Sequence, residues 1–422
     1  MIPLLIYVTI FVVAYFIVNK VIKGVGPKGY ASRKTVTFGD ESAVRPNRIA
    51  GVVSILSIFL LWGIFTGSTL LPSFLHAPAP FKGDTSFTYT AESESKETDD
   101  ATVSIIVHPR KEKAASPEVD PGEGFATNDS AAVAQWRTRL INVGRNDKPE
   151  SGGKVKVIAI NGESISPGGS VEVDGGKVTL TDKGTPNFEP SRGWQMEPLY
   201  LPAPEKVWDR TLKIASEGFR NFTLAEHLGY SLFRVVVGFF LGALVGIPLG
   251  YAMGLSDWFR GWFDPIVEFM RPVPPLALIP LVIIWAGIGE NGKIILLFLA
   301  ALWIMAIAAR SGVSGVNISK IHAAYSLGAN KKQIMRYVII PNSLPEIFTG
   351  ARVAMGVCWG TVVAAELVAA EQGAGMMIMT ASKFQNTDIV IMGIILIGVI
   401  GFGIDMLMRW AERILVPWKG KG

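Results

Sequence analysis

Four ionisable side chains lie inside long apolar runs, and their type and position make them the first candidates for chemistry: Arg234, Arg352, Glu366 and Asp405. A charge in such a run is costly unless it is paired or hydrated, so it commonly binds a charged ligand or another side chain. Arg352 and Asp405 lie at similar distances from the cytoplasmic ends of their runs, and we predict that they meet. An Arg352 that extends to the membrane surface is the alternative.

Arg234 and Glu366 lie near the outer ends of their own runs, so they should be at comparable depth. One or both of them would then line a pathway across the membrane. Arg234 is the candidate cation for meeting an anionic solute.

The turn Gly287-Ile-Gly-Glu-Asn-Gly-Lys293 imitates two nucleotide-binding motifs. It fits the dinucleotide pattern G-x-G-x-x-G and nearly fits the phosphate loop G-x-x-x-x-G-K-[ST]. However, Ile294 replaces the hydroxyl residue that would hold magnesium, and the turn follows a proline-broken apolar run rather than a strand. We therefore predict a tight connection between two spans on the outer side, and no nucleotide site.

The other residue types that do chemistry are scattered. We find no convincing metal cluster or nucleophile triad in the sequence, and the single cysteine, Cys358, lies in an apolar run. The histidines are far apart in sequence: His76, His108, His227 and His322. We predict no catalytic residue, no metal site and no cofactor bound by this chain.

Composition divides the chain into membrane and water-exposed parts. Of 422 residues, 49% are hydrophobic and the mean hydropathy is +0.36, which is too apolar for a soluble protein and too polar for one wholly in the membrane. Basic residues gather in the loops after the first and fifth apolar runs, which predicts an outer N-terminus and a cytoplasmic C-terminus. The first run has no signal-peptide features. Seven spans are predicted, at about 2–19, 49–71, 223–253, 273–289, 293–310, 346–369 and 389–409.

The polar stretch 319–341 lies between two spans and carries four positive charges, which predicts a cytoplasmic position. Its first residue, Ser319, can cap a short helix, and Gly328 supplies the left-handed residue that ends this helix. Asn330 opens a capping box for a second helix, which Pro341 should stop. The pattern predicts an L-shaped projection, and an amphipathic helix pair at the membrane surface is the alternative.

A regular glycine pattern marks the long helix predicted from Thr223, which forms a capping box with Glu226, to about Met253. A helix face without side chains lets another backbone approach closely, so we predict tight helix packing along it. This glycine face contains Gly238, Gly242, Gly246 and Gly250.

Residues 81–200 differ from the rest, because long apolar runs give way to short alternating segments. Three of these segments have the pattern of half-buried strands, at 85–90, 102–107 and 154–160. A hairpin should turn at Asp174-Gly175-Gly176. The region 109–153 is rich in Pro, Gly, Ser and charge, which predicts loop or partial disorder. We expect a β-rich insertion on the outer side, either a binding module or a spacer.

Four domains are therefore expected. They are 1–48, an additional N-terminal helix with a basic cytoplasmic loop; 49–80, the first core span; 81–200, the insertion; and 201–422, the remaining core with its projection at 319–341.

Several segments of this core, in order, resemble the permeases of ATP-binding-cassette (ABC) importers. The similarity is greatest to the branch for taurine, alkanesulfonates and nitrate, and within it to taurine permeases. It implies a polytopic α-helical protein whose six-span type I core follows one additional helix. The segments are Arg271-Pro-Val-Pro-Pro-Leu-Ala-Leu-Ile-Pro280, Ile288-Gly-Glu290, Leu327-Gly-Ala329, Pro345-Glu-Ile-Phe-Thr-Gly350 and Val362-Val-Ala-Ala-Glu-Leu-Val-Ala-Ala370.

The projection resembles the cytoplasmic "EAA" loop of these permeases, which docks into a cleft on the ATPase subunit. His322 stands where the loop usually has Glu, so a salt bridge of that Glu is not carried over. The resemblance implies these coupling residues: His322, Ala323, Ala324, Gly328, Ala329, Ile334, Val338 and Pro341.

The resemblance also implies partners and a mechanism. Two copies of the chain would line a pathway in the bacterial inner membrane, and two ATPase subunits, which bind ATP and magnesium, would grip the projections. A periplasmic binding protein would deliver taurine or another small sulfonate, and alternating access would move it inward. Lipid would be a further partner, and nucleic acid would not.

Three alternatives remain open. A permease for nitrate or another small anion has the same architecture. A secondary transporter would need coupling carboxylates near the midplane and often an internal repeat, and neither is evident. A membrane-anchored adhesin or sensor would explain the insertion but not the spans.

Overall fold

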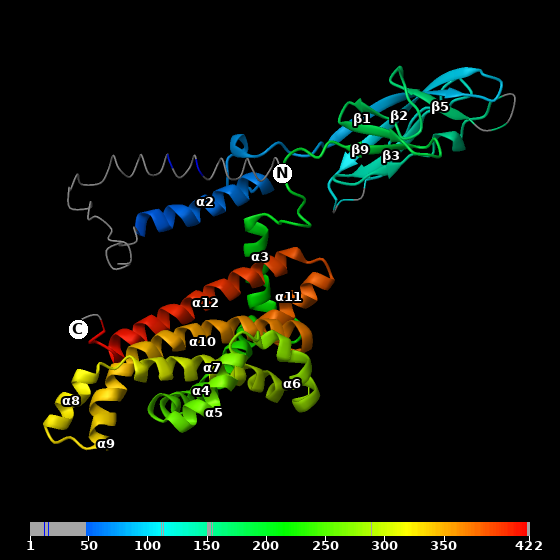
Figure 1. Ribbon diagram of the computed structural model, residues 1–422. Helices are drawn as coiled ribbons and strands as arrows, with labels where there is room; N and C mark the ends of the chain where they lie inside the picture. The colour runs from blue at the N-terminus through cyan, green and yellow to red at the C-terminus, as the bar shows by residue number, and fades with distance from the viewer. Residues whose placement is uncertain are drawn as a thin grey trace. The chain divides into compact units, whose positions relative to one another are not determined.

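The computed structural model describes residues 12, 16, 48–110, 112, 114–149, 153, 155–287 and 289–419 (Figure 1). The predicted span at 2–19 and the basic loop after it therefore lie outside the described residues. The chain divides into two compact units, with the boundary between Glu205 and Lys206. Each unit is described by itself.

From residue 48 onward, the described part of the first unit contains one apolar helix, α2 (Arg48–Thr66). It ends about five residues earlier than predicted, because Gly67 adopts the left-handed conformation with φ of +60°. Glu205 then holds the turn that follows, since its carboxylate accepts hydrogen bonds from Ser68 Oγ at 2.6 Å and Thr69 N at 2.9 Å. The next residues form the short 3-10 helix η3 (Ser73–Leu75).

The insertion folds as two sheets. Their strand orders are β3-β2-β1-β5-β6 and β4-β9-β8-β7, and all neighbours are antiparallel except β2 and β3. The first sheet contains β1 (Gly83–Glu92), β2 (Thr98–His108), β3 (Asp129–Ala134), β5 (Lys156–Ile160) and β6 (Glu163–Ser164). The second contains β4 (Arg139–Leu140), β7 (Ser170–Val173), β8 (Gly176–Leu180) and β9 (Pro186–Pro190).

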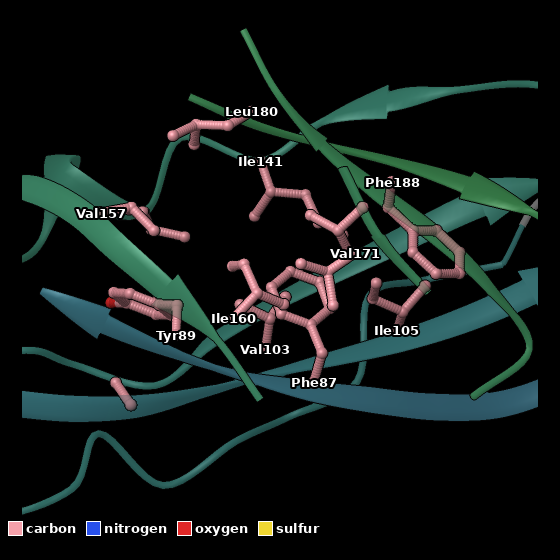
Figure 2. Close-up of a cluster of buried hydrophobic side chains, with 14 of the residues drawn as sticks. Phe87, Tyr89, Val103, Ile105, Ile141, Val157, Ile160, Val171, Leu180 and Phe188 are labelled. Carbon is pink, nitrogen blue, oxygen red and sulfur yellow. The ribbon is translucent and has the colours of Figure 1, made fainter. Parts of the chain in front are cut away.

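One hydrophobic core lies between the two sheets (Figure 2). Alternate residues of β1 point inward, which buries Phe87 and Tyr89 as the period of a strand requires. The second sheet contributes Leu180 and Phe188, both almost completely buried. Each side chain of this size stabilises the fold by roughly 1.5–3 kcal/mol when it leaves water.

The strand predictions are partly confirmed. The hairpin turns at Asp174-Gly175 between β7 and β8, with φ of +73° at Gly175. The prediction of loop for all of 109–153 is wrong, because β3 and β4 lie there with the 3-10 helix η4 (Val143–Arg145). The sequence analysis did not predict β3, because its partner β2 is parallel and distant in sequence. It did not predict β9, because this strand begins and ends with proline.

The two chain segments that enter and leave the sandwich run side by side. Phe81 N donates to Ser191 O at 2.9 Å, and Trp194 N donates to Pro78 O at 2.8 Å. Farther along, Met196 N donates to Phe65 O at 2.8 Å. The insertion therefore starts and ends at neighbouring points, which is typical of a domain placed in a loop.

The second unit is helical. Its described elements are α3 (Pro204–Glu217), α4 (Leu224–Leu255), α5 (Asp257–Met270), η5 (Pro275–Leu278), α6 (Ile279–Ala286), α7 (Glu290–Ser314), α8 (Ile318–Ser326), α9 (Lys331–Ile334), η6 (Met335–Ile339), α10 (Ile340–Ala369), α11 (Ala374–Lys383) and α12 (Thr387–Leu415). The capping box predicted at Thr223 and Glu226 opens α4. In Figure 1, α8 and α9 lie at one end of this unit, and α6 and α11 at the other.

Within the described residues, four helices are long and apolar enough to cross a membrane, or five if a bent pair counts as one span. The span predicted at 273–289 is not one continuous helix, and its prolines break it as the sequence indicates. Pro275–Ala286 forms the second half of a bent pair, which meets Asp257–Met270 at 93°. Prolines interrupt the helix there, and α6, at 8 residues or about 12 Å, is too short to span.

The glycine face of α4 packs closely on α7, as the spacing predicts. A Cβ atom added at Gly242 would lie 2.6 Å from the Cβ of Ala301, and one added at Gly250 would lie 2.3 Å from the backbone oxygen of Ala306. Equivalent atoms at Gly238 and Gly246 would lie 2.4 and 2.6 Å from α7. Real Cβ atoms would force the two helices apart.

Excision of the sandwich tests its independence. Because Phe81 and Ser191 are hydrogen-bonded neighbours, a short Gly-Ser linker can replace residues 82–190 without stretching the chain. We expect the shortened protein to insert into membranes in wild-type amount and to keep the thermal unfolding midpoint of its helical unit. Loss of membrane insertion would show that the core needs the sandwich in order to fold.

Candidate functional site

The predicted projection consists of α8, a glycine turn and α9. Gly328 has φ of +81°, so it supplies the left-handed residue that the sequence predicts. Asn330 and Gln333 form the predicted capping box, with bonds of 2.8 and 2.9 Å. The first cap differs, because Asn317 rather than Ser319 accepts the hydrogen bond that opens α8.

The prediction that Pro341 stops the second helix is wrong. α9 continues through the π-helical segment η6 into α10, so that one helix of 38 residues runs from Lys331 to Val368. The wide π turn directly precedes Pro341, whose ring would clash with the carbonyl group one α-helical turn earlier. A rigid element therefore connects the projection to the membrane interior.

The coupling residues implied by the resemblance divide into two groups. Ile334 is buried, and Ala324, Ala329 and Val338 are half-buried, so these four form the small core of the projection with Val313 of α7. His322, Ala323 and Gly328 are exposed, and Pro341 is half-buried.

The exposed surface of the projection also includes two large apolar side chains that the sequence analysis did not predict as coupling residues. Leu327 is 88% exposed and Tyr337 is 68% exposed, and both line a groove that also contains Gly328 and Gln333. The chain thus presents large apolar groups where a partner could cover them. The sequence could have indicated Leu327, because this residue directly precedes the turn glycine, Gly328.

Side-chain contacts fix the projection to the spans. Tyr251 of α4 lies 2.5 Å from Ser343 of α10, measured between their hydroxyl oxygens. Lys320 Nζ donates to Asn342 Oδ1 at 2.8 Å. These two bonds join α4 to α10 and the start of α8 to α10.

Arg234 is the centre of a second site. Its side chain is 0% exposed, and two carboxylates surround it. Its Nε and Nη2 donate to Glu290 at 2.5 and 2.7 Å, which is the bidentate geometry that suits guanidinium and carboxylate. Its Nη1 donates to Glu366 at 2.6 Å and to the backbone oxygen of Gln372 at 3.0 Å.

Glu366 is equally buried, and its remaining lone pairs also have donors. Ser231 Oγ lies 2.8 Å from its Oε1, and Gly375 N donates to its Oε2 at 2.9 Å. The backbone must pass very close to this carboxylate. A Cβ at Gly373 would lie 2.3 Å from Glu366 Cδ, and its φ of +133° also favours glycine.

His227 belongs to the same network as a neutral imidazole. Gly373 N donates to its Nδ1 at 3.1 Å, so its other nitrogen, Nε2, donates to Phe219 O at 2.9 Å. Lys293 Nζ donates to Glu290 Oε1 at 3.0 Å. Two cations and two carboxylates therefore balance one another where α4, α7, α10 and the segment before α11 meet.

This geometry favours a structural role for Arg234. The prediction that Arg234 and Glu366 lie at one depth fits their contact, but the side chain is fully buried and four of the five guanidinium N–H groups donate to protein oxygens in this conformation. Glu290 was not predicted as a partner, because it follows a turn between two apolar runs. A search for every carboxylate near the ends of the apolar runs, as a possible partner of Arg234, would have included Glu290.

The predicted pair of Arg352 and Asp405 is present. Arg352 Nε and Nη2 both lie 3.2 Å from Asp405 Oδ1, and Arg409 donates to Asp405 Oδ2 at 2.7 Å. The Arg352 side chain is 29% exposed, so water screens this pair more than the pair at Arg234. Glu412 lies 3.9 Å from Arg352, and it also pairs with Lys419.

The tail of the chain returns to the base of the projection. Trp418 Nε1 donates to Pro341 O at 3.1 Å, and Lys419 Nζ donates to Thr349 Oγ1 at 3.3 Å.

Ion pairs also join α7 to α5, because Arg310 of α7 pairs with Asp264 and Glu268 of α5. Ion pairs thus connect several helices at their ends.

Comparisons with known proteins agree with these features. The family model "Binding-protein-dependent transport system inner membrane component" matches residues 242–416. The "Taurine transport system permease protein TauC" of Escherichia coli (strain K12) is 48% identical over 227 residues, which is 54% of this chain and 82% of that protein.

Two further relatives are more distant. The "Putative aliphatic sulfonates transport permease protein SsuC" of the same strain is 36% identical, over 54% of this chain and 85% of that protein. The "Nitrate import permease protein NrtB" of Synechocystis is 31% identical, over 54% of this chain and 86% of that protein.

Paired substitutions test the contrast between the two arginines. Arg234→Met leaves the buried Glu366 without a cation and Glu290 with Lys293 alone, and we expect a loss of about 3–5 kcal/mol in the free energy of unfolding. The matched variant Arg352→Met breaks a partly exposed pair, and we expect a loss of at most about 1 kcal/mol. Thermal or denaturant unfolding in detergent measures both, and equal losses would contradict this account.

Proposed function

Because this chain belongs to the family of binding-protein-dependent transport system inner membrane components, we propose that it carries taurine or a related small sulfonate. It is the permease subunit of an ABC importer for small anions, as its relatives are. It is a multi-pass protein of the inner membrane. Permease subunits of this family have no ATPase site of their own, so a separate subunit hydrolyses ATP.

One observation carries the choice of substrate. Identity is 48% to the taurine permease, against 36% and 31% to the aliphatic sulfonate and nitrate permeases, over nearly the same share of this chain. A small anion or zwitterion is common to all three names. Taurine is therefore the first candidate and nitrate the second.

The proposed mechanism is alternating access in a pair of identical permeases. Each of two ATPase subunits, with ATP and magnesium, grips one projection through the surface that contains His322, Leu327, Gly328 and Tyr337. Closure of the ATPases moves α8 and α9, and the continuous helix from Lys331 to Val368 transmits this motion to the spans. A periplasmic binding protein delivers the solute at the other side.

The β-sandwich has a proposed place in this scheme. It is inserted between α2 and α3, and the predicted topology puts that connection in the periplasm. A delivering protein would land on the same side, so the sandwich either contacts that protein or acts as a spacer. In transport assays, the variant without residues 82–190 separates these roles, since only a contact role raises the binding-protein concentration required for half-maximal uptake.

Reconstituted uptake tests the substrate. The permease is placed in proteoliposomes with its ATPase and binding protein, and ATP-dependent accumulation of labelled taurine is measured. We expect taurine uptake that excess unlabelled alkanesulfonate reduces and equal nitrate does not. Uptake of nitrate without taurine would assign the chain to the second candidate, and ATP-independent uptake of either solute would contradict an ABC importer.

Gly328 provides a test of coupling. No heavy atom lies within 4 Å of a Cβ at this position, so a substitution there acts through the backbone alone. Gly328→Val should cost on the order of 1–2 kcal/mol in the turn and lower transport at least several-fold, with the permease still folded. Gly328→Asn is the matched control, because asparagine tolerates the left-handed conformation. Equal transport by both variants would exclude a need for this turn.

A further inference from the structure

A cluster of oxygen atoms lies in the β-sandwich and takes no part in the transport scheme. The hydroxyl group of Tyr89 lies 3.0 Å from both Asp147 Oδ1 and the backbone oxygen of Thr127. Thr127 N donates to Asp147 Oδ1 at 2.8 Å, and Asn146 Nδ2 donates to Asp129 Oδ1 at 3.1 Å. These bonds hold the five residues in one neighbourhood.

Each of four side chains in this cluster has a buried oxygen without a hydrogen-bond partner among the residues that the structure describes. These oxygens are Thr127 Oγ1, Asp129 Oδ2, Asn146 Oδ1 and Asp147 Oδ2. Asp147 is only 8% exposed, so bulk water does not compensate its free oxygen. Buried polar atoms are nearly always satisfied, because an unpaired one costs about 1–3 kcal/mol.

The unpaired atoms have one chemical character. Two are carboxylate oxygens, one is an amide oxygen and one is a hydroxyl oxygen, so the cluster has acceptors in excess and lacks a cation. The two carboxylates each leave one buried oxygen, Asp129 Oδ2 and Asp147 Oδ2, without a donor among the described residues.

An oxygen-only set selects the type of cation. Hard divalent ions prefer carboxylate, carbonyl and hydroxyl oxygens, whereas zinc and copper prefer nitrogen and sulfur. Calcium accepts irregular sets of six to eight oxygens, whereas magnesium requires a near-ideal octahedron and keeps several waters. The described residues contain no group of three or more His, Cys, Asp or Glu that could hold a metal, so this set depends on its amide and hydroxyl oxygens.

We propose that Thr127, Asp129, Asn146 and Asp147 bind one calcium ion in the β-sandwich. Asp129 is the first residue of β3, and Asp147 follows η4, so the ion ties an edge strand to the long connection that leads to β5. Waters complete its coordination. Calcium would thereby stabilise the segment in which the sequence pattern predicts only loop.

The test uses the full-length permease, purified in detergent and treated with EDTA. Calorimetric titration with calcium chloride at pH 7 should show one site per chain, with a dissociation constant on the order of 10⁻⁴ to 10⁻³ M, the range of extracellular modules. Calcium should also raise the thermal unfolding midpoint. Equal concentrations of magnesium should give at least ten-fold weaker binding.

Variants locate the site. Asp147→Asn should weaken calcium binding at least ten-fold, whereas Asp182→Asn, at an exposed turn of the same sandwich, should leave it unchanged. Thr127→Val removes one neutral ligand and should weaken calcium binding less than Asp147→Asn does. This second variant keeps the test decisive if Asp147→Asn fails to fold, and circular dichroism measures the folding of both variants. Absence of binding at 10-fold above the expected range, or equal loss in the Asp182 variant, would overturn the proposal. A buried water or a shared proton would then satisfy the four oxygens.

Discussion

The packing of α4, α7 and α10 around Arg234 depends on one buried guanidinium. Arg234 cannot leave water without partners, because an isolated ion costs several kcal/mol in an apolar environment. The structure supplies Glu290 from α7 and Glu366 from α10, and the segment before α11 adds a backbone carbonyl. The two carboxylates come from different helices, so the charge balance also fixes how α4, α7 and α10 meet.

The glycine face makes this balance possible. Gly238 lies one helical turn after Arg234, and it removes the side chain that would hold α7 away. Close approach of α7 then brings Glu290, at its first turn, within bonding distance. Packing and electrostatics are therefore not separate contributions here, because the small residues determine whether the charges can pair.

The sequence revealed those features whose cause is local. Both capping boxes and the left-handed Gly328 depend on residues within one or two turns, and the glycine face repeats about once per turn of a single helix, so spacing alone predicted them. The features it missed arise between distant segments. Glu290 became a partner only through helix packing, and β3 only through pairing with β2. At Pro341 the local rule failed, because a π turn absorbed the clash that ends most helices.

The pairing of buried charges also bears on how an anion crosses. Arg234 and Lys293 both have carboxylate partners, and so does Arg352. A fixed free cation would bind an anionic solute tightly and slow its release, whereas passage requires binding weak enough to end. We expect the pathway of this permease to hold its solute weakly, through neutral groups, and selection to occur mainly before the solute enters. Arginines that are paired with carboxylates agree with this expectation, since they stabilise the helices without binding the solute.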